Sequence, residues 1–133
     1  MVYIDIPRRE ILMGMKVLVA DDSGVMRKII IRALNGCGVN DIVEAGDGAE
    51  AISKFSKEPV DLVMTDWNMP NKTGLEVVQE IRATGSKVPI LMITTEAEVS
   101  RVKEAIAAGV NDYLAKPFEN DLLRQKIDKF VVA

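Results

Sequence analysis

Residues 60–70 are Val60-Asp61-Leu62-Val63-Met64-Thr65-Asp66-Trp67-Asn68-Met69-Pro70. The first six residues form a mostly apolar run, which predicts a buried strand, and Pro70 bounds it. Asp66 therefore stands at the carboxyl end of a buried strand. In open α/β sheets, ligands bind in the crevice outside this end of the strands. Asp66 is accordingly the first candidate for a functional residue.

The same alternation of strand and helix occurs five times along the chain. Strands are predicted at 16–20, 41–45, 60–65, 89–94 and 112–115. Apolar residues at helical spacing follow each strand, at Met26 to Leu34, Ala51 to Phe55, Leu75 to Ile81, Val99 to Ile106 and Leu123 to Phe130. Five such units predict an α/β fold with a doubly wound five-stranded parallel sheet covered on both faces. We expect the strand order 2-1-3-4-5, with a switch point beside the first strand.

The length of 133 residues indicates one domain, which we place at 15–133, preceded by an N-terminal extension at 1–14. Two readings of the extension stay open, an untethered tail or translation that starts at Met15. Tyr3, Ile4 and Ile6 could add a short strand or pack on the surface, whereas Pro7-Arg8-Arg9 is expected to break any regular pattern.

Composition excludes several classes of function. The net charge of −3 argues against a general binder of nucleic acid or of anionic membranes. No apolar stretch is long enough to span a bilayer, and the N-terminus lacks the core of a signal peptide, so we expect a cytoplasmic protein. The chain has no histidine, which excludes His-based zinc sites, Ser-His-Asp triads and an internal phosphohistidine. Cys37 has no basic neighbour and is interpreted as a small packed residue at a helix end.

Other strand ends have groups that complement Asp66. Asp21-Asp22 follows the first strand, Lys116 follows the fifth, and Thr94-Thr95 ends the fourth. Two carboxylates about 4 Å apart repel by about 4 kcal/mol at an effective dielectric near 20, so such a cluster requires a cation. Oxygen ligands without histidine or thiolate favour Mg²⁺ or a similar divalent ion. A nucleophilic carboxylate, a metal, a lysine and a hydroxyl can together accept a phosphoryl group.

From Lys16 to Phe130 the sequence resembles the receiver domain of two-component response regulators, most closely the single-domain chemotaxis regulators of the CheY type, with their flavodoxin-like fold. The matching motifs are Asp21-Asp22-Ser23 with Arg27, Asp66-Trp67-Asn68-Met69-Pro70-Asn71, Thr94-Thr95-Glu96 and Lys116-Pro117-Phe118. Their order and spacing are highly specific as a set.

The resemblance implies a role for each matched residue. Asp66 would be the phosphoacceptor. Mg²⁺ or Mn²⁺ would be bound by Asp21, Asp22, Asp66 and the backbone carbonyl of Asn68. The phosphoryl oxygens would be stabilised by Lys116, the Thr94 hydroxyl and the backbone N–H groups of Trp67 and Thr95. The Lys116-Pro117 bond is expected to be cis, an isomer populated almost only before proline.

The resemblance also implies a switch, in which Thr94 moves toward the phosphoryl group and Tyr113 turns inward. The output face would be formed by the helix after the fourth strand, the fifth strand and the last helix. Its expected residues are Glu96, Lys103, Tyr113 and Lys126. Taken singly, Lys103 and Lys126 are more typical of an ordinary solvated helix face.

Two positions depart from the family pattern. Thr73-Gly74 replaces the usual Asp-Gly, and because the turn glycine is kept we expect little effect. Thr95 replaces a smaller residue after the switch threonine and is expected to crowd the phosphoryl pocket.

The resemblance implies a regulator that catalyses only its own phosphorylation and dephosphorylation. The donor would be a sensor histidine kinase of the chemotaxis type, since this chain has no histidine. After Phe130 only three residues remain, so we expect no effector domain and a protein target, in the first place the flagellar motor switch. A phosphatase is a possible further partner, while nucleic acid and membrane are not expected.

Three alternatives stay open at this point. The first is a stand-alone receiver in a phosphorelay outside chemotaxis. The second is a magnesium-dependent phosphatase with an aspartate nucleophile, although Asn68 replaces the second acid that would donate a proton. The third is a flavin binder of flavodoxin type, in which Asp21-Asp22 would repel the cofactor phosphate.

Overall fold

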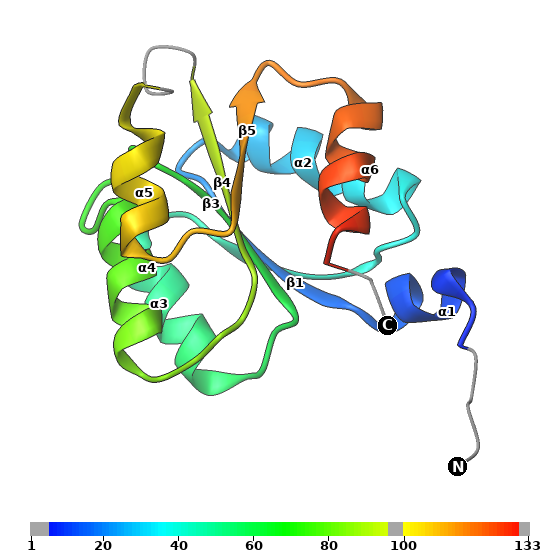
Figure 1. The fold of residues 1–133 in the computed structure, drawn as a ribbon, viewed down its shortest axis with the longest axis horizontal. Helices are drawn as coiled ribbons and strands as arrows, with labels where there is room; N and C mark the ends of the chain where they lie inside the picture. The colour runs from blue at the N-terminus through cyan, green and yellow to red at the C-terminus, as the bar shows by residue number, and fades with distance from the viewer. Residues whose placement is uncertain (1–5, 96–99, 131–133) are drawn as a thin grey trace.

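A computed structural model describes residues 6–95 and 100–130. Its centre is a five-stranded parallel sheet in the order β2-β1-β3-β4-β5, as predicted (Figure 1). The strands are β1 (Lys16–Ala20), β2 (Asp41–Ala45), β3 (Leu62–Asp66), β4 (Ile90–Thr95) and β5 (Asp112–Lys116). The fold class expected from the alternation of strands and helices is thereby confirmed.

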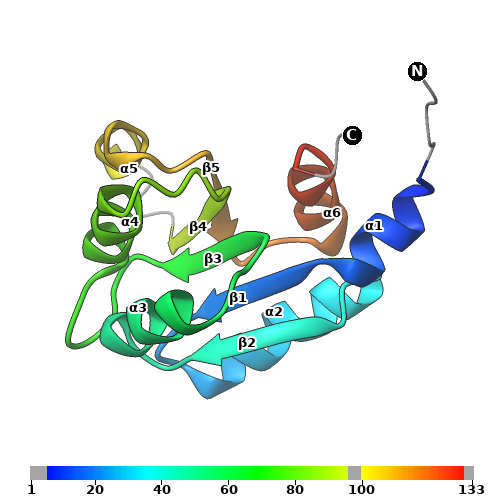
Figure 2. The same cartoon turned by 90° about the horizontal axis from the view of Figure 1, so that it is seen from below.

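Helices cover both faces of the sheet. They are α1 (Arg8–Gly14), α2 (Gly24–Gly36), α3 (Gly48–Lys57), α4 (Gly74–Ala83), α5 (Val102–Ala108) and α6 (Asn120–Asp128). Helices α2 and α6 lie on one side of the sheet, and α3, α4 and α5 lie on the other (Figures 1 and 2). None of the helices within residues 6–95 and 100–130 is long and apolar enough to cross a membrane.

The central strands are buried on both faces. Val17 and Val19 of β1 pack in the core beneath α2 and α6, whereas Leu18 and Ala20 pack beneath α3 and α4. Successive side chains of a strand point to opposite faces, so a strand between two helical layers needs apolar residues at every position. This burial explains the continuous apolar runs in the sequence.

Three strands, β3, β4 and β5, differ from the prediction by one or two residues at their ends. β3 begins at Leu62 rather than at residue 60, because the backbone N–H of Asp61 donates to the Lys16 carbonyl and its carboxylate accepts from the Lys16 N–H (2.8 Å each). At its other end β3 includes Asp66. β4 extends to Thr95 and β5 to Lys116, and these two residues pair in the ladder between the strands. The candidate residues therefore belong to the sheet itself.

The prediction that Pro7-Arg8-Arg9 breaks any regular pattern was wrong. Pro7 instead precedes α1, and its carbonyl accepts the N–H groups of Glu10 and Ile11. Proline is tolerated at a helix start because its missing N–H would be unpaired there. Leu12 of α1 is only 6% exposed and packs in the core formed with α2 and α6. Ile6 is half exposed, while Tyr3 and Ile4 lie outside the described residues.

The predicted apolar stripe of α5 was also partly wrong. Ile106 is 54% exposed, and Ala105 is the buried residue of this helix. The inward face follows Val102 and Ala105, because α5 is only seven residues long and packs on α4 at one edge. Val99 lies outside the described residues. Ile29, part of the predicted stripe of α2, is likewise exposed beside the buried Ile30.

Candidate functional site

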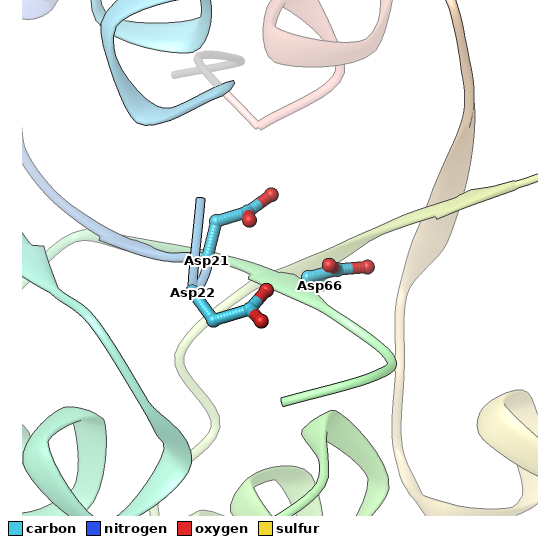
Figure 3. A group of neighbouring side chains, drawn as sticks. All are labelled: Asp21, Asp22 and Asp66. Atoms are coloured by element: carbon cyan, nitrogen blue, oxygen red, sulfur yellow. The ribbon is translucent and has the colours of Figure 1, made fainter. Parts of the chain in front are cut away.

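The parallel strands end along one edge of the sheet, and the predicted site residues meet there. Asp21 and Asp22 follow β1, and Asp66 ends β3, with carboxylates that project in the same general direction (Figure 3). One carboxylate oxygen from each of the three residues lies within 4.8 Å of the other two. Residues that are up to 45 positions apart in sequence thus form one acidic cluster.

Asp21 is buried and held through both carboxylate oxygens. Its Oδ1 accepts the backbone N–H of Ser23 (2.9 Å), and its Oδ2 accepts the Lys116 ammonium (3.0 Å). Ser23 also caps the N-terminus of α2 through its hydroxyl, so the loop is tied to the helix start. The Arg27 guanidinium donates to the Asp21 carbonyl and to Glu44. The loop after β1 is therefore fixed, whereas Asp22 is exposed at its tip.

Asp66 is 8% exposed and is contacted on both oxygens. Its Oδ1 accepts the backbone N–H of Trp67 (2.8 Å), and its Oδ2 lies 3.2 Å from the Lys116 ammonium. The Asp66 carbonyl lies so close to Gly74 that a Cβ on Gly74 would be 2.0 Å from its oxygen. The start of α4 therefore presses on the end of β3, and only glycine fits at position 74.

Burial raises the pKa of Asp66 above its ordinary value, against the opposing charge of Lys116, and the charge of Asp21 adds to the increase. Burial alone would lower the pKa of Lys116, but its hydrogen bond to Asp21 and the charge of Asp66 outweigh burial and raise it. Lys116 consequently keeps its positive charge at neutral pH and partly neutralises the acidic cluster.

The donor set of this cluster fits a divalent metal ion. Three carboxylates and one ammonium leave an excess of two negative charges, which a divalent cation would balance. Carboxylate oxygens are hard ligands of the kind that Mg²⁺ prefers. Asn68, whose backbone carbonyl was predicted as a further ligand, is exposed two residues after Asp66.

The hydroxyl residues predicted for the site end the neighbouring strand β4. Thr94 is fully buried, and its hydroxyl donates to the Thr95 carbonyl (3.2 Å). Thr95 is exposed and pairs with Lys116 in the ladder between β4 and β5. The Lys116-Pro117 bond directly after β5 is cis, as expected.

Comparison with known proteins identifies the family. The family described as response regulator receiver domain matches residues 17–128. This chain belongs to the response regulator receiver family.

The relatives of this receiver include chemotaxis proteins. It is 43% identical to the chemotaxis protein CheY-3 of Vibrio cholerae over 87% of this chain and 91% of that protein. It is 44% identical to a CheY homologue of Campylobacter jejuni over 86% of this chain and 90% of that protein.

Two solved structures have the same fold. The chemotaxis response regulator CheY4 of V. cholerae superposes with a TM-score of 0.80 at 35% identity, covering 87% of this chain and 98% of that one. The second structure is the receiver domain of the sensor histidine kinase PA1611 of Pseudomonas aeruginosa, with a magnesium ion coordinated in its active-site cleft. It superposes with a TM-score of 0.80 at 29% identity, covering 89% of this chain and 98% of that one.

Part of the predicted output face of the receiver is connected by side-chain contacts. The Lys126 ammonium lies 5.3 Å from the centre of the half-buried Tyr113 ring and 3.0 Å from an Asp112 oxygen. Lys129 reaches the other Asp112 oxygen (3.2 Å). Burial alone would raise the pKa of Asp112, but the hydrogen bonds from Lys126 and from the Tyr113 N–H outweigh burial and lower it. Lys126 is thus not an ordinary solvated lysine.

The other two residues predicted for this face are Lys103 and Glu96. Lys103 is exposed on α5, and Glu96 lies outside the described residues. Asp112 is not among the functional residues predicted from sequence. The available signal was an acid directly before Tyr113, with two lysines at helical spacing in the last helix.

The departure at Thr73-Gly74 has a structural explanation. Thr73 caps α4 in a capping box, in which its hydroxyl accepts the Glu76 N–H (3.2 Å) and the Glu76 carboxylate accepts the Thr73 N–H (3.1 Å). Threonine satisfies the helix start in the way that aspartate would, since both side chains offer an oxygen acceptor.

Proposed function

We propose that this receiver accepts a phosphoryl group on Asp66 from a sensor histidine kinase. The observation that supports the proposal best is the placement of the Asp66 carboxylate between the Lys116 ammonium and the Trp67 N–H, beside two more acids. Membership of the receiver family gives independent support, because receivers work in two-component signalling.

The reaction needs few groups from the protein. A carboxylate oxygen of Asp66 attacks the phosphorus of a phosphohistidine, the P–N bond breaks, and the donor imidazole leaves with the bonding electron pair. Lys116 balances charge on the phosphoryl oxygens, together with the Thr94 hydroxyl and the N–H groups of Trp67 and Thr95. A Mg²⁺ or Mn²⁺ ion bound by Asp21, Asp22, Asp66 and the Asn68 carbonyl would neutralise the remaining negative charge.

The switch is proposed to connect this edge of the sheet with the output face. Thr94 is drawn toward the phosphoryl group, and Tyr113 turns into the space that Thr94 leaves. The face that changes consists of α5, β5 and α6, with Glu96, Lys103, Tyr113 and Lys126. Because Lys126 contacts the Tyr113 ring, an inward turn of Tyr113 would remove one of its two partners.

We propose the flagellar motor switch as the target, because the relatives are named chemotaxis proteins. A receiver in another phosphorelay is the second candidate. If phosphorylation increases the binding of a flagellar switch peptide, the motor switch is supported as the target. If the phosphorylated and unphosphorylated forms bind the peptide equally weakly, a role in another phosphorelay is supported. In either role the receiver would act in the cytoplasm as a regulator that catalyses only its own phosphorylation and dephosphorylation. Family membership removes the support for the phosphatase and the flavin binder.

The core of the proposal is tested by incubation with Mg²⁺ and acetyl phosphate, followed by intact mass. We expect one added phosphoryl group, lost in Asp66→Asn and kept in the control Asp41→Asn, which changes an exposed aspartate at the start of β2. No adduct on the parent protein, under conditions that phosphorylate a known receiver, would contradict the proposal.

A further inference from the structure

The ring of Trp67 is covered by an arginine that the site motifs do not include. The guanidinium carbon of Arg101 lies 4.5 Å from the centre of the Trp67 ring, and Trp67 is only 2% exposed. Arg101 directly precedes α5. A guanidinium over an indole face is the strongest common arrangement of a cation and an aromatic ring. The start of α5 is therefore attached, through its N-cap residue, to the residue that follows Asp66.

Trp67 is held at three points. Its backbone N–H donates to Asp66 Oδ1 (2.8 Å), and its carbonyl accepts the Gly74 N–H (2.7 Å) at the start of α4. Its ring packs in the core beneath α4 and α5, where Val77 and Ala105 are buried. Ring and N–H belong to one residue, so a tilt of the ring displaces the N–H that orients the Asp66 carboxylate.

We propose that Arg101 is a positioning residue for the phosphorylation of Asp66. By holding the Trp67 ring it keeps the Trp67 N–H directed at Asp66 Oδ1, and the other carboxylate oxygen stays oriented toward Lys116 and the incoming phosphorus. The inference deepens the proposed function and rests on it. It also assigns a second link between the acceptor and α5, separate from Thr94 and Tyr113.

A competing explanation of Arg101 is its ion pair with Glu104, three residues along the chain. That contact is 3.3 Å long, and about half of each side chain is exposed. Exposed pairs of this kind contribute little to stability because water and salt screen them. Glu104→Gln removes the ion pair and leaves the guanidinium over Trp67, so it is a matched control for the aromatic contact.

The test compares Arg101→Gln, Arg101→Lys and Glu104→Gln with the parent protein. The first readout is the initial rate of phosphorylation by acetyl phosphate and Mg²⁺, measured by intact mass. The second is acrylamide quenching of Trp67, the single tryptophan of the chain. Thermal unfolding of each variant verifies that it is folded.

We expect Arg101→Gln to slow phosphorylation about three- to tenfold, which lies within the range for loss of a cation–aromatic contact. Its Trp67 should be quenched more strongly, because the ring loses its cover. Arg101→Lys should restore part of the rate, and Glu104→Gln should leave both readouts unchanged.

The inference is overturned if Arg101→Gln phosphorylates within twofold of the parent or faster, or if lysine is no better than glutamine. A rate loss shared by Glu104→Gln would also overturn it, since the ion pair would then be the cause. If the parent itself gains no phosphoryl group, the proposed function fails first, and this inference falls with it.

Discussion

Replacement of the Asp66 carboxylate by its neutral isostere, Asp66→Asn, is expected to stabilise the protein in the absence of metal. The asparagine side chain would have nearly the same shape, and its oxygen can still accept the Trp67 N–H. The substitution removes a buried negative charge from a cluster that already contains Asp21 and Asp22. A cluster of like charges lowers the stability of the folded protein, and proteins keep such clusters where function requires them.

The charges of the site set the size of the effect. The carboxylate oxygens lie within 4.8 Å of one another, and at an effective dielectric near 20 a like-charge pair at that distance repels by about 3.5 kcal/mol, so the repulsion from Asp21 offsets most of the attraction of about 5 kcal/mol from Lys116 at 3.2 Å. Burial then decides the balance against the carboxylate and raises the pKa of Asp66. When folding raises the pKa of a carboxyl, the folded protein loses stability as the pH rises through that raised pKa. We expect Asp66→Asn to gain about 2 kcal/mol at pH 7 and progressively less toward pH 4.

Urea unfolding with EDTA at pH 7 and pH 4 measures this difference. Added Mg²⁺ at ten times its dissociation constant should stabilise the parent by about 1.4 kcal/mol and the variant by less. The difference in unfolding free energy between the two proteins should therefore become smaller. The exposed Asp41→Asn should stay within about 0.5 kcal/mol of the parent throughout. A less stable Asp66→Asn at pH 7 without metal would refute the electrostatic reasoning.

Three other changes test separate parts of the structure. Gly74→Ala should cost at least about 3 kcal/mol of unfolding free energy, since its Cβ would meet a backbone oxygen, while Gly36→Ala, with nothing within 4 Å, should be neutral or slightly stabilising; equal effects in urea unfolding would contradict the predicted clash. Asp112→Asn should cost about 1 kcal/mol at pH 7 and progressively less as the pH falls below 3.8, because the stability contributed by a lowered pKa is full above the ordinary value and is lost as the pH falls through the lowered one; a loss independent of pH would disagree. Thr95→Ala should raise the initial rate of phosphorylation by acetyl phosphate, and an equal or slower rate would show that Thr95 does not crowd the pocket.

The fold could be predicted from sequence because each of its signals is local. Apolar runs between glycine and proline turns define the strands, and the limits of β1 and β2 agree with the prediction residue by residue. The meeting of Asp21, Asp66 and Lys116 was also predictable, since parallel strands end on the same edge of a sheet. Topology alone brings those residues together.

The features that sequence reasoning missed depend on tertiary contacts. The segment around Pro7 forms a helix because Leu12 finds a place in the core, which local pattern does not reveal. The contact of Arg101 with Trp67 depends on which way one side chain turns at the start of a helix. Ile106 is exposed because the short α5 presents a neighbouring face. Such outcomes follow from packing between elements rather than from spacing along the chain.

Helix α1 lies at the edge of the sheet where the strands begin, and the acidic cluster lies at the edge where they end (Figure 2). The two ends of the molecule can therefore be modified independently. A fluorescent protein, an affinity tag or a surface linker joined ahead of Pro7 would leave the approach of a kinase open. Joined directly at Met15, the same partner would replace Leu12 and remove part of the core.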